Sequence, residues 1–177
     1  IIDATTNANT GTPGAAFTGA ASVGGKIGQA ISFNGTSDFF SVSNSSSINL
    51  SGDQFTIQAW INAPDNTTDN AIMVKGFTNG SEQYWLGIGN AGSPDYVISR
   101  ASVNGSYFPY SGGAVSAGNW QHIVFTYDAS KAFPNQFEVY IDGVPAYSQF
   151  GTGGNVDASV YPLLIGKRLT SSDYING

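Results

Sequence analysis

The chain has 177 residues, of which 41% are hydrophobic and only 10% are charged, and it contains no cysteine. Six basic residues against twelve acidic ones give a net charge of −6, which argues against nucleic acid as a partner because phosphate binding needs a basic patch. The lack of cysteine excludes disulfides and thiolate chemistry. No apolar run approaches the roughly 20 residues of a membrane span, so we expect no membrane insertion.

Short β-rich runs separated by turn residues follow one another along the chain, and none shows a helical period beyond one turn. Residues 1–14 contain turn-forming residues throughout and are expected to be a loop. Asx-Gly pairs at 34–35, 79–80, 104–105 and 142–143 predict tight turns, because both central positions of such a turn need a positive φ. The expected strands are 15–18, 29–33, 38–42, 55–63, 72–75, 83–88, 96–103, 106–110, 120–127, 137–141, 144–150 and 163–167.

Residues 118–143 form the part of the sequence with the clearest pattern. An aromatic strand at 120–127 leads through a polar loop to a second strand at 137–141. The first strand carries bulky residues on both faces, which predicts that both faces are covered and that the strand lies inside a layered sheet structure.

The pattern W-x-H-[IV]-x-x-T-Y-D, followed ten residues later by V-Y-I-D-G, resembles the laminin-G-like, pentraxin-like group of the concanavalin A-like lectin/glucanase superfamily. Residues 25–42 (GKIGQAISFNGTSDFFSV), 55–62 (FTIQAWIN) and 163–166 (LLIG) are similar to further strands of this group. The resemblance implies an all-β fold, a concanavalin A-like antiparallel β-sandwich (jelly roll) of about a dozen strands with essentially no helix. It also implies further strands at both ends, so we expect residues 1–177 to be a single domain of a longer polypeptide.

The alternation at 83–88 singles out Trp85 as a candidate ligand-binding residue. Tyr84 and its apolar neighbours on the same side are expected in the core, which would place Trp85 on the outer sheet surface beside Gln83. There the CH groups of a sugar would stack on the indole and the amide would bind hydroxyls. The alternative is that a loop such as 106–113 covers Trp85.

Three further residues complete the candidate ligand-binding set. Tyr107 and Tyr110 belong to the run 107–113, which contains proline and glycines and is expected to form a rim loop. Arg100 lies in the middle of a predicted strand and therefore needs a carboxylate partner or a ligand.

Two other aromatic side chains are expected to be structural. Trp60 lies on the mixed face of strand 55–63 and would suit a sugar platform, but the matching position of the resembling family packs as core. His122 is the only histidine; its position is structural in the family, and no G-x-S-x-G motif accompanies it for a catalytic triad.

The resemblance also suggests a calcium site. Asp3, Asn7 and Asn9 form an Asp-x-x-x-Asn-x-Asn pattern similar to a segment that can help to hold a calcium in related domains. Calcium takes six to eight oxygen ligands, so backbone carbonyls would have to complete one structural site. The alternative is a solvated loop closed by Asx turns. Calcium-bridged ligand binding of the pentraxin type is not expected, because Lys167 and Arg168 occupy the loop that would need carboxylates.

These patterns predict a non-catalytic, lectin-like or adhesive module that binds a glycan or polysaccharide. Glycoside hydrolysis needs paired carboxylates, and neither Glu82 nor Glu138 lies in the E-x-D-x-x-E pattern of sandwich glucanases; a hydrolase is the remote alternative. The other alternative is a structural spacer or decoration domain that packs against neighbouring protein domains in an adhesin or virion. The lack of disulfides favours a bacterial or viral protein that is secreted or displayed on a surface.

Overall fold

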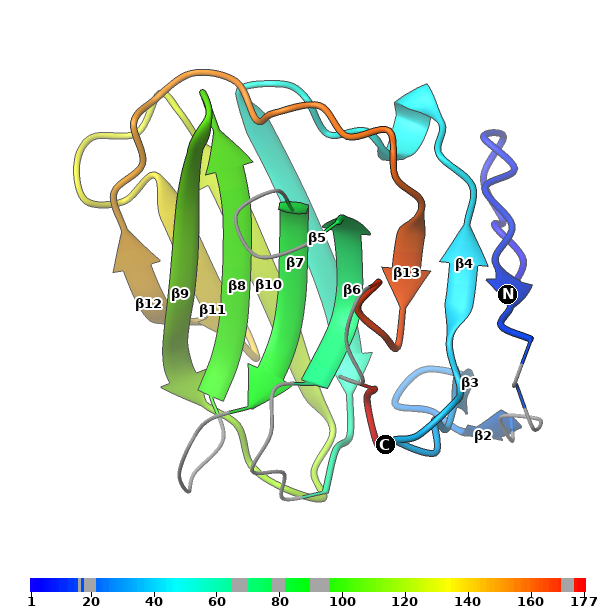
Figure 1. Ribbon diagram of the computed structural model, residues 1–177. Helices are drawn as coiled ribbons and strands as arrows, with labels where there is room; N and C mark the ends of the chain where they lie inside the picture. Colours follow the sequence, from blue (N-terminus) through cyan, green and yellow to red (C-terminus); the bar gives the residue numbers. More distant parts are fainter. Residues whose placement is uncertain (16, 18–21, 65–69, 78–81, 90–95, 170–173) are drawn as a thin grey trace.

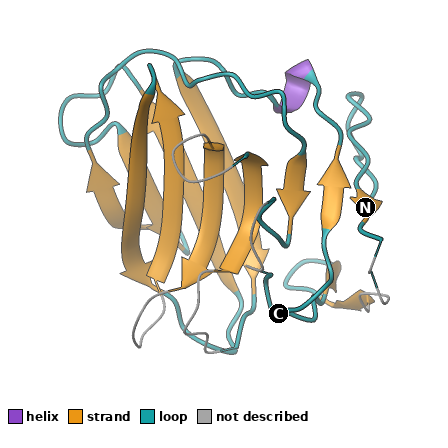
Figure 2. Ribbon diagram, viewed as in Figure 1, coloured by secondary structure: helices purple, strands orange, loops and turns teal. Residues whose placement is uncertain are grey.

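A computed structural model describes residues 1–15, 17, 22–64, 70–77, 82–89, 96–169 and 174–177. Within these ranges thirteen β-strands and one 3₁₀ turn, η1 (Ser46–Ile48), make up the regular structure, as Figure 2 shows. The predicted all-β class is confirmed. The described part of the chain has no helix long and apolar enough to span a membrane. Predictions for 15–18, 64–70, 79–80 and 169–173 fall wholly or partly outside the described residues.

Two antiparallel sheets lie face to face (Figure 1). The larger sheet has the order β1-β4-β13-β6-β7-β8-β9 and the smaller one the order β12-β11-β10-β5. A hairpin of β2 (Ser22–Gly24) and β3 (Gln29–Ile31) stands apart from both. The remaining bounds are β1 (Thr12–Pro13), β4 (Phe40–Val42), β5 (Gln54–Ile61), β6 (Asn70–Gly76), β7 (Glu82–Gly89), β8 (Tyr96–Val103), β9 (Ser106–Ala114), β10 (Gln121–Asp128), β11 (Phe137–Ile141), β12 (Val144–Gln149) and β13 (Leu163–Ile165).

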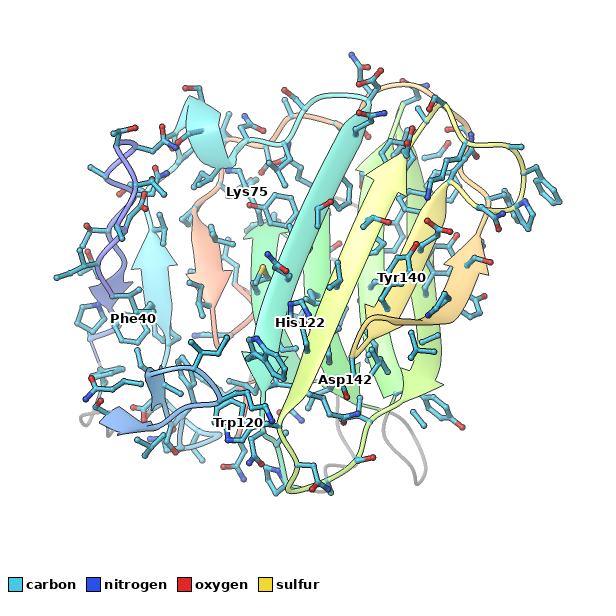
Figure 3. The ribbon with its side chains drawn as sticks, turned by 180° about the vertical axis from the view of Figure 1, so that it is seen from behind. Phe40, Lys75, Trp120, His122, Tyr140 and Asp142 are labelled. Atoms are coloured by element: carbon cyan, nitrogen blue, oxygen red, sulfur yellow. The ribbon has the colours of Figure 1, made fainter. Side chains whose placement is uncertain are left out.

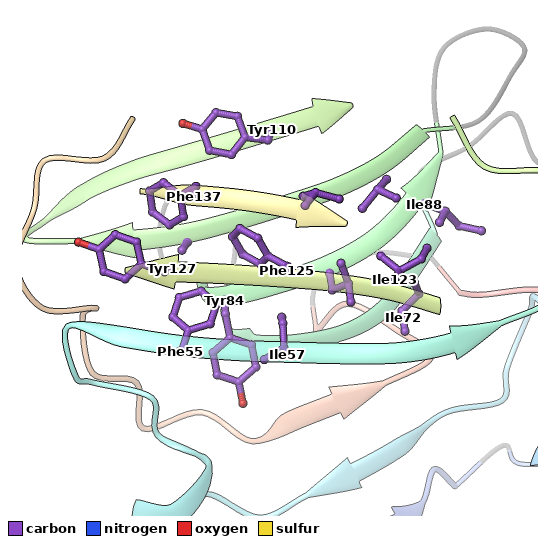
Figure 4. Close-up of a cluster of buried hydrophobic side chains, with 14 of the residues drawn as sticks. Phe55, Ile57, Ile72, Tyr84, Ile88, Tyr110, Ile123, Phe125, Tyr127 and Phe137 are labelled. Carbon is purple, nitrogen blue, oxygen red and sulfur yellow. The ribbon is translucent and has the colours of Figure 1, made fainter. Parts of the chain in front are cut away.

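The core fills the space between the two sheets and is rich in aromatic rings (Figure 4). Alternate residues of the central strands point to it, because side chains in a strand alternate between the two faces of the sheet. Phe137 stacks on Tyr127 with ring centroids 4.6 Å apart and on Phe125 at 5.8 Å, and Phe55 meets Phe125 edge to face at 5.3 Å. Burial of several large rings is the main favourable term for a sandwich of this size.

Two of the four Asx-Gly pairs form the predicted tight turns, whereas Asn34 has no positive φ and pairs with Asn176 instead. Asn104 and Gly105 have φ values of 49° and 71°, and Asp142 and Gly143 have 52° and 79°. Two consecutive positive φ angles match the right-handed twist of the flanking strands. The turns join β8 to β9 and β11 to β12, and both predictions are confirmed.

Two sequence predictions about strands are wrong. Residues 107–113 form no rim loop but belong to β9, which is the edge strand of the larger sheet. An edge tolerates Pro109 and the glycines because one side of the strand needs no ladder hydrogen bonds. Strand β10 is covered on one face only: its burial alternates between buried and half-buried residues, so its bulky outward side chains line a surface.

Candidate functional site

Trp85 lies on the outward side of β7, as the alternation predicts, but its side chain has no exposed surface. The guanidinium groups of Arg100 and Arg168 lie 3.5 Å and 4.5 Å from the centroid of its ring. Small and aliphatic side chains pack around the same indole, namely Ala71, Val74 and Ile98. The predicted exposed platform is therefore wrong, since a buried ring offers no face to a sugar.

Gln83 and Tyr110 are buried as well; Gln83 shares the outward side of the larger sheet with Trp85, whereas Tyr110 does not. The Gln83 amide nitrogen donates to the side-chain oxygen of Asn49. Tyr110 points to the opposite side of its sheet, into the core, where its ring lies 5.8 Å from that of Phe137. The prediction that these two side chains line an exposed site is wrong.

Tyr107 and Arg100 are half-buried on the outward side of the larger sheet. Burial raises the pKa of Tyr107 to about 12, against the opposing effect of the Arg100 charge. Arg168 donates to Glu82 at 2.6 Å in a buried ion pair beside them. This region is a packed cluster of cations, one carboxylate and rings, and we call Glu82, Trp85, Arg100 and Arg168 the arginine–tryptophan cluster.

The Asp3 loop is closed by its own hydrogen bonds. One carboxylate oxygen of Asp3 accepts from the Thr5 N–H and the other from the Asn9 N–H, both at 2.8 Å. These bonds, the one from Thr5 foremost, hold the pKa of Asp3 below its ordinary value. The Asn9 side chain accepts a hydrogen bond from the Ser45 hydroxyl and donates one to the Ser47 hydroxyl.

A calcium ion would find a poor donor set in this loop. Asp3 supplies its only carboxylate, and Asn7 takes part through its backbone N–H, which donates to the Thr5 hydroxyl at 3.2 Å. Within the described ranges no group of three or more His, Cys, Asp or Glu residues could hold a metal ion. Asp3, Asn7 and Asn9 therefore do not make up a calcium site on their own. Calcium binding by these residues is a prediction from the sequence that the structure does not support.

The outward side of the smaller sheet is an open surface that combines aromatic, amide and hydroxyl groups (Figure 3). Every outward residue of β5 is exposed and every outward residue of β10 is half-buried. We call this surface the β5–β10–β11 face. Its residues are Gln54, Thr56, Gln58, Trp60, His122, Val124, Thr126, Asp128, Glu138 and Tyr140.

Trp60 and His122 form the aromatic end of this face. They are cross-strand partners, and their rings stack at 5.0 Å between centroids with 25° between planes. The His122 Nε2 atom lies 2.9 Å from the side-chain oxygen of Gln58, which fixes the imidazole. Trp60 keeps 38% of its surface exposed, and the Lys26 ammonium lies 5.8 Å from the centroid of its ring.

This arrangement corrects the core assignment of Trp60 and the buried-strand interpretation of His122. The sequence contained the signal: Trp60 shares its side of β5 with Thr56 and Gln58, so the alternation places it on the polar face. The alternation along β5 therefore predicts the exposure of Trp60 correctly, and the family resemblance does not.

The other end of the face is a hollow of about 340 Å³ beside Tyr140, Lys131 and Asp128. Glu138 accepts from Lys131 and from the Tyr140 hydroxyl, and the hydrogen bond that Tyr140 donates to Glu138 raises the pKa of Tyr140. The Ser130 hydroxyl, followed by Gln54, lowers the pKa of Asp128. Both carboxylates at this end are thus satisfied by neighbours within the protein.

Comparison with known proteins agrees with this architecture. The family profile described as "Concanavalin A-like lectin/glucanases superfamily" matches residues 34–177. Comparison with curated protein sequences gives no match.

Three solved structures share the fold. Domain 4 of AbnA, a GH43 extracellular arabinanase from Geobacillus stearothermophilus solved in complex with arabinotriose, is 18% identical, with a TM-score of 0.67 over 94% of this chain and 77% of that chain. The native heptameric SAP-like pentraxin from Limulus polyphemus is 16% identical, with a TM-score of 0.50 over 78% of this chain and 71% of that one. The globular domain of T. cruzi calreticulin is 11% identical, with a TM-score of 0.54 over 88% and 80%.

Proposed function

Because the chain belongs to the concanavalin A-like lectin/glucanases superfamily, we propose that it is a non-catalytic carbohydrate-binding module whose β5–β10–β11 face holds a polysaccharide chain. The observation that carries the proposal is the exposed Trp60 ring, stacked on His122 at one end of a face whose outward residues include Gln58, Thr56 and Thr126. An aromatic ring beside polar groups is the combination that sugars require, since their CH groups stack and their hydroxyls form hydrogen bonds.

The face has the length for several sugars. From Gln54 to Trp60 the strand β5 covers roughly 20 Å at about 3.3 Å per residue, and Thr56 and Gln58 are exposed along it. On β11, Tyr140 adds a second ring in the cross-strand row of Gln58 and Val124. Few contacts per sugar give weak affinity at one site, so function would depend on several modules or repeated epitopes.

A neutral glycan suits the charges of this face. Lys131 offsets the charge of Glu138, and Asp128 accepts hydrogen bonds from Gln54 and Ser130, so both carboxylates already have partners within the protein. The AbnA domain was solved in complex with arabinotriose, which makes arabinose-containing polysaccharides the first compounds to test. The origin of AbnA as an extracellular enzyme supports an extracellular location here as well.

The carboxylates support a binding role rather than hydrolysis. Glycosidases use two accessible carboxyl groups about 5–10 Å apart. Glu82 is buried and paired with Arg168, and Glu138 is engaged by Lys131, so neither glutamate is free to act on a glycosidic bond. We therefore propose that the module binds without catalysis.

Affinity electrophoresis tests the proposal. Wild type, Trp60→Ala and Phe133→Ala would be run through native gels that contain arabinan, other neutral polysaccharides or none. Phe133 is the control because it is an exposed ring (76%) that is stacked on Phe150 and is not one of the residues of the face. We expect at least one polysaccharide to retard wild type and Phe133→Ala, but not Trp60→Ala. Equal retardation of all three proteins, or none in any gel, would contradict the proposal.

One observation favours the structural alternative. Phe133 and Phe150 form an exposed stacked pair with centroids 5.5 Å apart, and exposed apolar patches often contact other proteins. If no polysaccharide binds, a spacer or decoration role with neighbouring protein domains becomes the favoured function, and Phe133 and Phe150 are the first residues to test.

A further inference from the structure

The hollow of about 340 Å³ at the end of the β5–β10–β11 face opposite Trp60 has a polar floor and an aromatic wall. Thr56 and Thr126 are direct cross-strand partners on the outward side of β5 and β10, so their hydroxyls lie side by side on the floor. Tyr140, on the neighbouring strand β11 (Figure 3), also lines the hollow. Because a hydroxyl both donates and accepts hydrogen bonds, this floor suits a ligand that carries hydroxyls.

The carboxylate of Asp128, which lines the same hollow, is held in place through one of its two oxygens. Its Oδ1 atom accepts from the Gln54 side-chain amide at 3.0 Å, from the Ser130 N–H at 2.9 Å and from the Ser130 hydroxyl at 2.6 Å. The hydrogen bonds that described residues donate to this carboxylate all go to Oδ1. The Oδ2 atom is therefore left to accept from a ligand, and an acceptor that is already positioned loses little freedom on binding.

The wall and the charges of the hollow are fixed as well. The Tyr140 hydroxyl donates to Glu138 Oε2 at 2.9 Å, and the same oxygen accepts from Lys131. Asp128 and Lys131 are the charged side chains among the described residues that line the hollow. Because Lys131 is paired with Glu138, the charge of Asp128 dominates, and an acidic ligand would meet like charge.

The size and position of the hollow indicate one unit of a longer ligand. Its volume lies near the lower limit of the roughly 300–1,000 Å³ of small-molecule sites, which suits a single sugar unit. Thr56 and Trp60 both point outward from β5, four residues or about 13 Å apart at a rise of about 3.3 Å per residue. An oligosaccharide can therefore stack on Trp60 and reach the hollow, whereas one sugar cannot do both.

We propose that this hollow is a second subsite, which binds one neutral sugar unit through two neighbouring free hydroxyls. The inference rests on the proposed glycan-binding function of the face. Asp128 Oδ2 accepts hydrogen bonds from the two hydroxyls, and such charge-assisted bonds are about twice as strong as neutral ones. The hydroxyls of Thr56 and Thr126 bind other oxygens of the sugar, and its CH groups pack on Tyr140. A uronic acid is rejected because its carboxylate would meet that of Asp128.

Titration of a pentasaccharide into ¹⁵N-labelled protein tests the subsite. The ligand would be prepared from arabinan, or from whichever neutral polysaccharide retards wild type most, with pentagalacturonate as the acidic ligand of equal length. In Asp128→Asn the amide oxygen keeps the three donors of Oδ1, so the NH₂ group takes the place of Oδ2. Thr56→Val removes a hydroxyl at an exposed strand position that a β-branched residue suits. The control is Asp3→Asn, the same change of charge in the N-terminal loop.

We expect the neutral pentasaccharide to shift the backbone amide signals of Thr56, Thr126 and Asp128 together with the indole signal of Trp60. Its dissociation constant should rise roughly tenfold in Asp128→Asn and about threefold in Thr56→Val, because hydrogen bonds to a charged group contribute more than neutral ones, and should not change in Asp3→Asn. Pentagalacturonate should bind more weakly than the neutral ligand.

The outcomes separate this subsite from the glycan function itself. Unchanged affinity in Asp128→Asn, with shifts confined to Trp60 and its neighbours, would overturn the subsite and leave the glycan function in place. Tighter binding of pentagalacturonate would overturn the preference for a neutral sugar. Loss of binding in Asp128→Asn but not in Trp60→Ala would support the hollow and reject stacking on Trp60. No binding of any oligosaccharide to wild type would reject both proposals.

Discussion

Trp85 and Trp60 both point outward from a strand of the sandwich, yet their surroundings differ completely. Trp85 is enclosed by Arg100, Arg168 and aliphatic side chains and has no exposed surface. Trp60 has a cross-strand histidine stacked beside it and keeps 38% of its surface exposed. An outward tryptophan can therefore offer its ring to a ligand only where its neighbours are short or polar enough to leave it uncovered. On the larger sheet Arg100 and Arg168 cover the ring of Trp85, so this tryptophan contributes to packing instead.

Truncation of the buried Trp85 side chain should lower the stability of the fold more than any other change considered. Trp85→Ala removes an entire buried indole, and we expect the free energy of unfolding to fall by about 3–5 kcal/mol. Chemical denaturation would measure this loss, with Trp60→Ala as the matched change on the open face, for which we expect about 1 kcal/mol. Similar losses in the two variants would remove the distinction between the two tryptophans.

Glu82→Gln should be the next most damaging change. It leaves the buried Arg168 guanidinium without the carboxylate that pairs with it, at a cost of about 3 kcal/mol. Glu138→Gln breaks the corresponding pair with the exposed Lys131 and should cost at most about 1 kcal/mol. Denaturation of both variants in the same buffer gives the comparison, and a larger loss for Glu138→Gln would refute the structural role of the arginine–tryptophan cluster.

Alkaline pH should weaken the fold through Tyr107. Burial raises the pKa of Tyr107 to about 12 from an ordinary value of 10.0, so the folded state favours the protonated phenol. The stability that this provides is complete below about pH 10 and is lost as pH rises from 10 through 12. Burial raises the pKa of Tyr84, Tyr110 and Tyr127 in the same direction. Denaturation between pH 9 and 12 should therefore show a steep loss that Tyr107→Phe makes shallower; an unchanged slope would contradict this.

Calcium should have the smallest effect. The Asp3 carboxylate is occupied by the N–H groups of Thr5 and Asn9, so we expect calcium to change the melting temperature of wild type no more than that of Asp3→Asn. Calorimetric unfolding with calcium and with chelator would measure both. A clear increase with calcium in wild type alone would establish the site that the sequence pattern suggests.

The sequence predicted the architecture better than the exposure of its side chains. Alternation and Asx-Gly pairs depend on neighbouring residues, so the strands around Asn104 and Asp142 and the side on which Trp85 lies were predictable. The burial of Trp85 was not, because Arg168 comes from a segment far along the chain. The exposure of Trp60 was predictable from its polar neighbours on β5. The strand structure of the whole run 107–113 was not predictable, because only the sheet order identifies this run as part of an edge strand.

The indole N–H signals provide the most direct test of the proposed binding face. The chain has three tryptophans, so a ¹⁵N-labelled sample gives three such signals, which Trp→Phe variants would assign. Arabinotriose, or an oligosaccharide of whichever polysaccharide retards the protein most, would be titrated into this sample. We predict that the Trp60 signal shifts progressively to saturation while the Trp85 signal stays in place. A shift of Trp85 without Trp60, or no shift of either at saturating oligosaccharide, would contradict glycan binding on the β5–β10–β11 face.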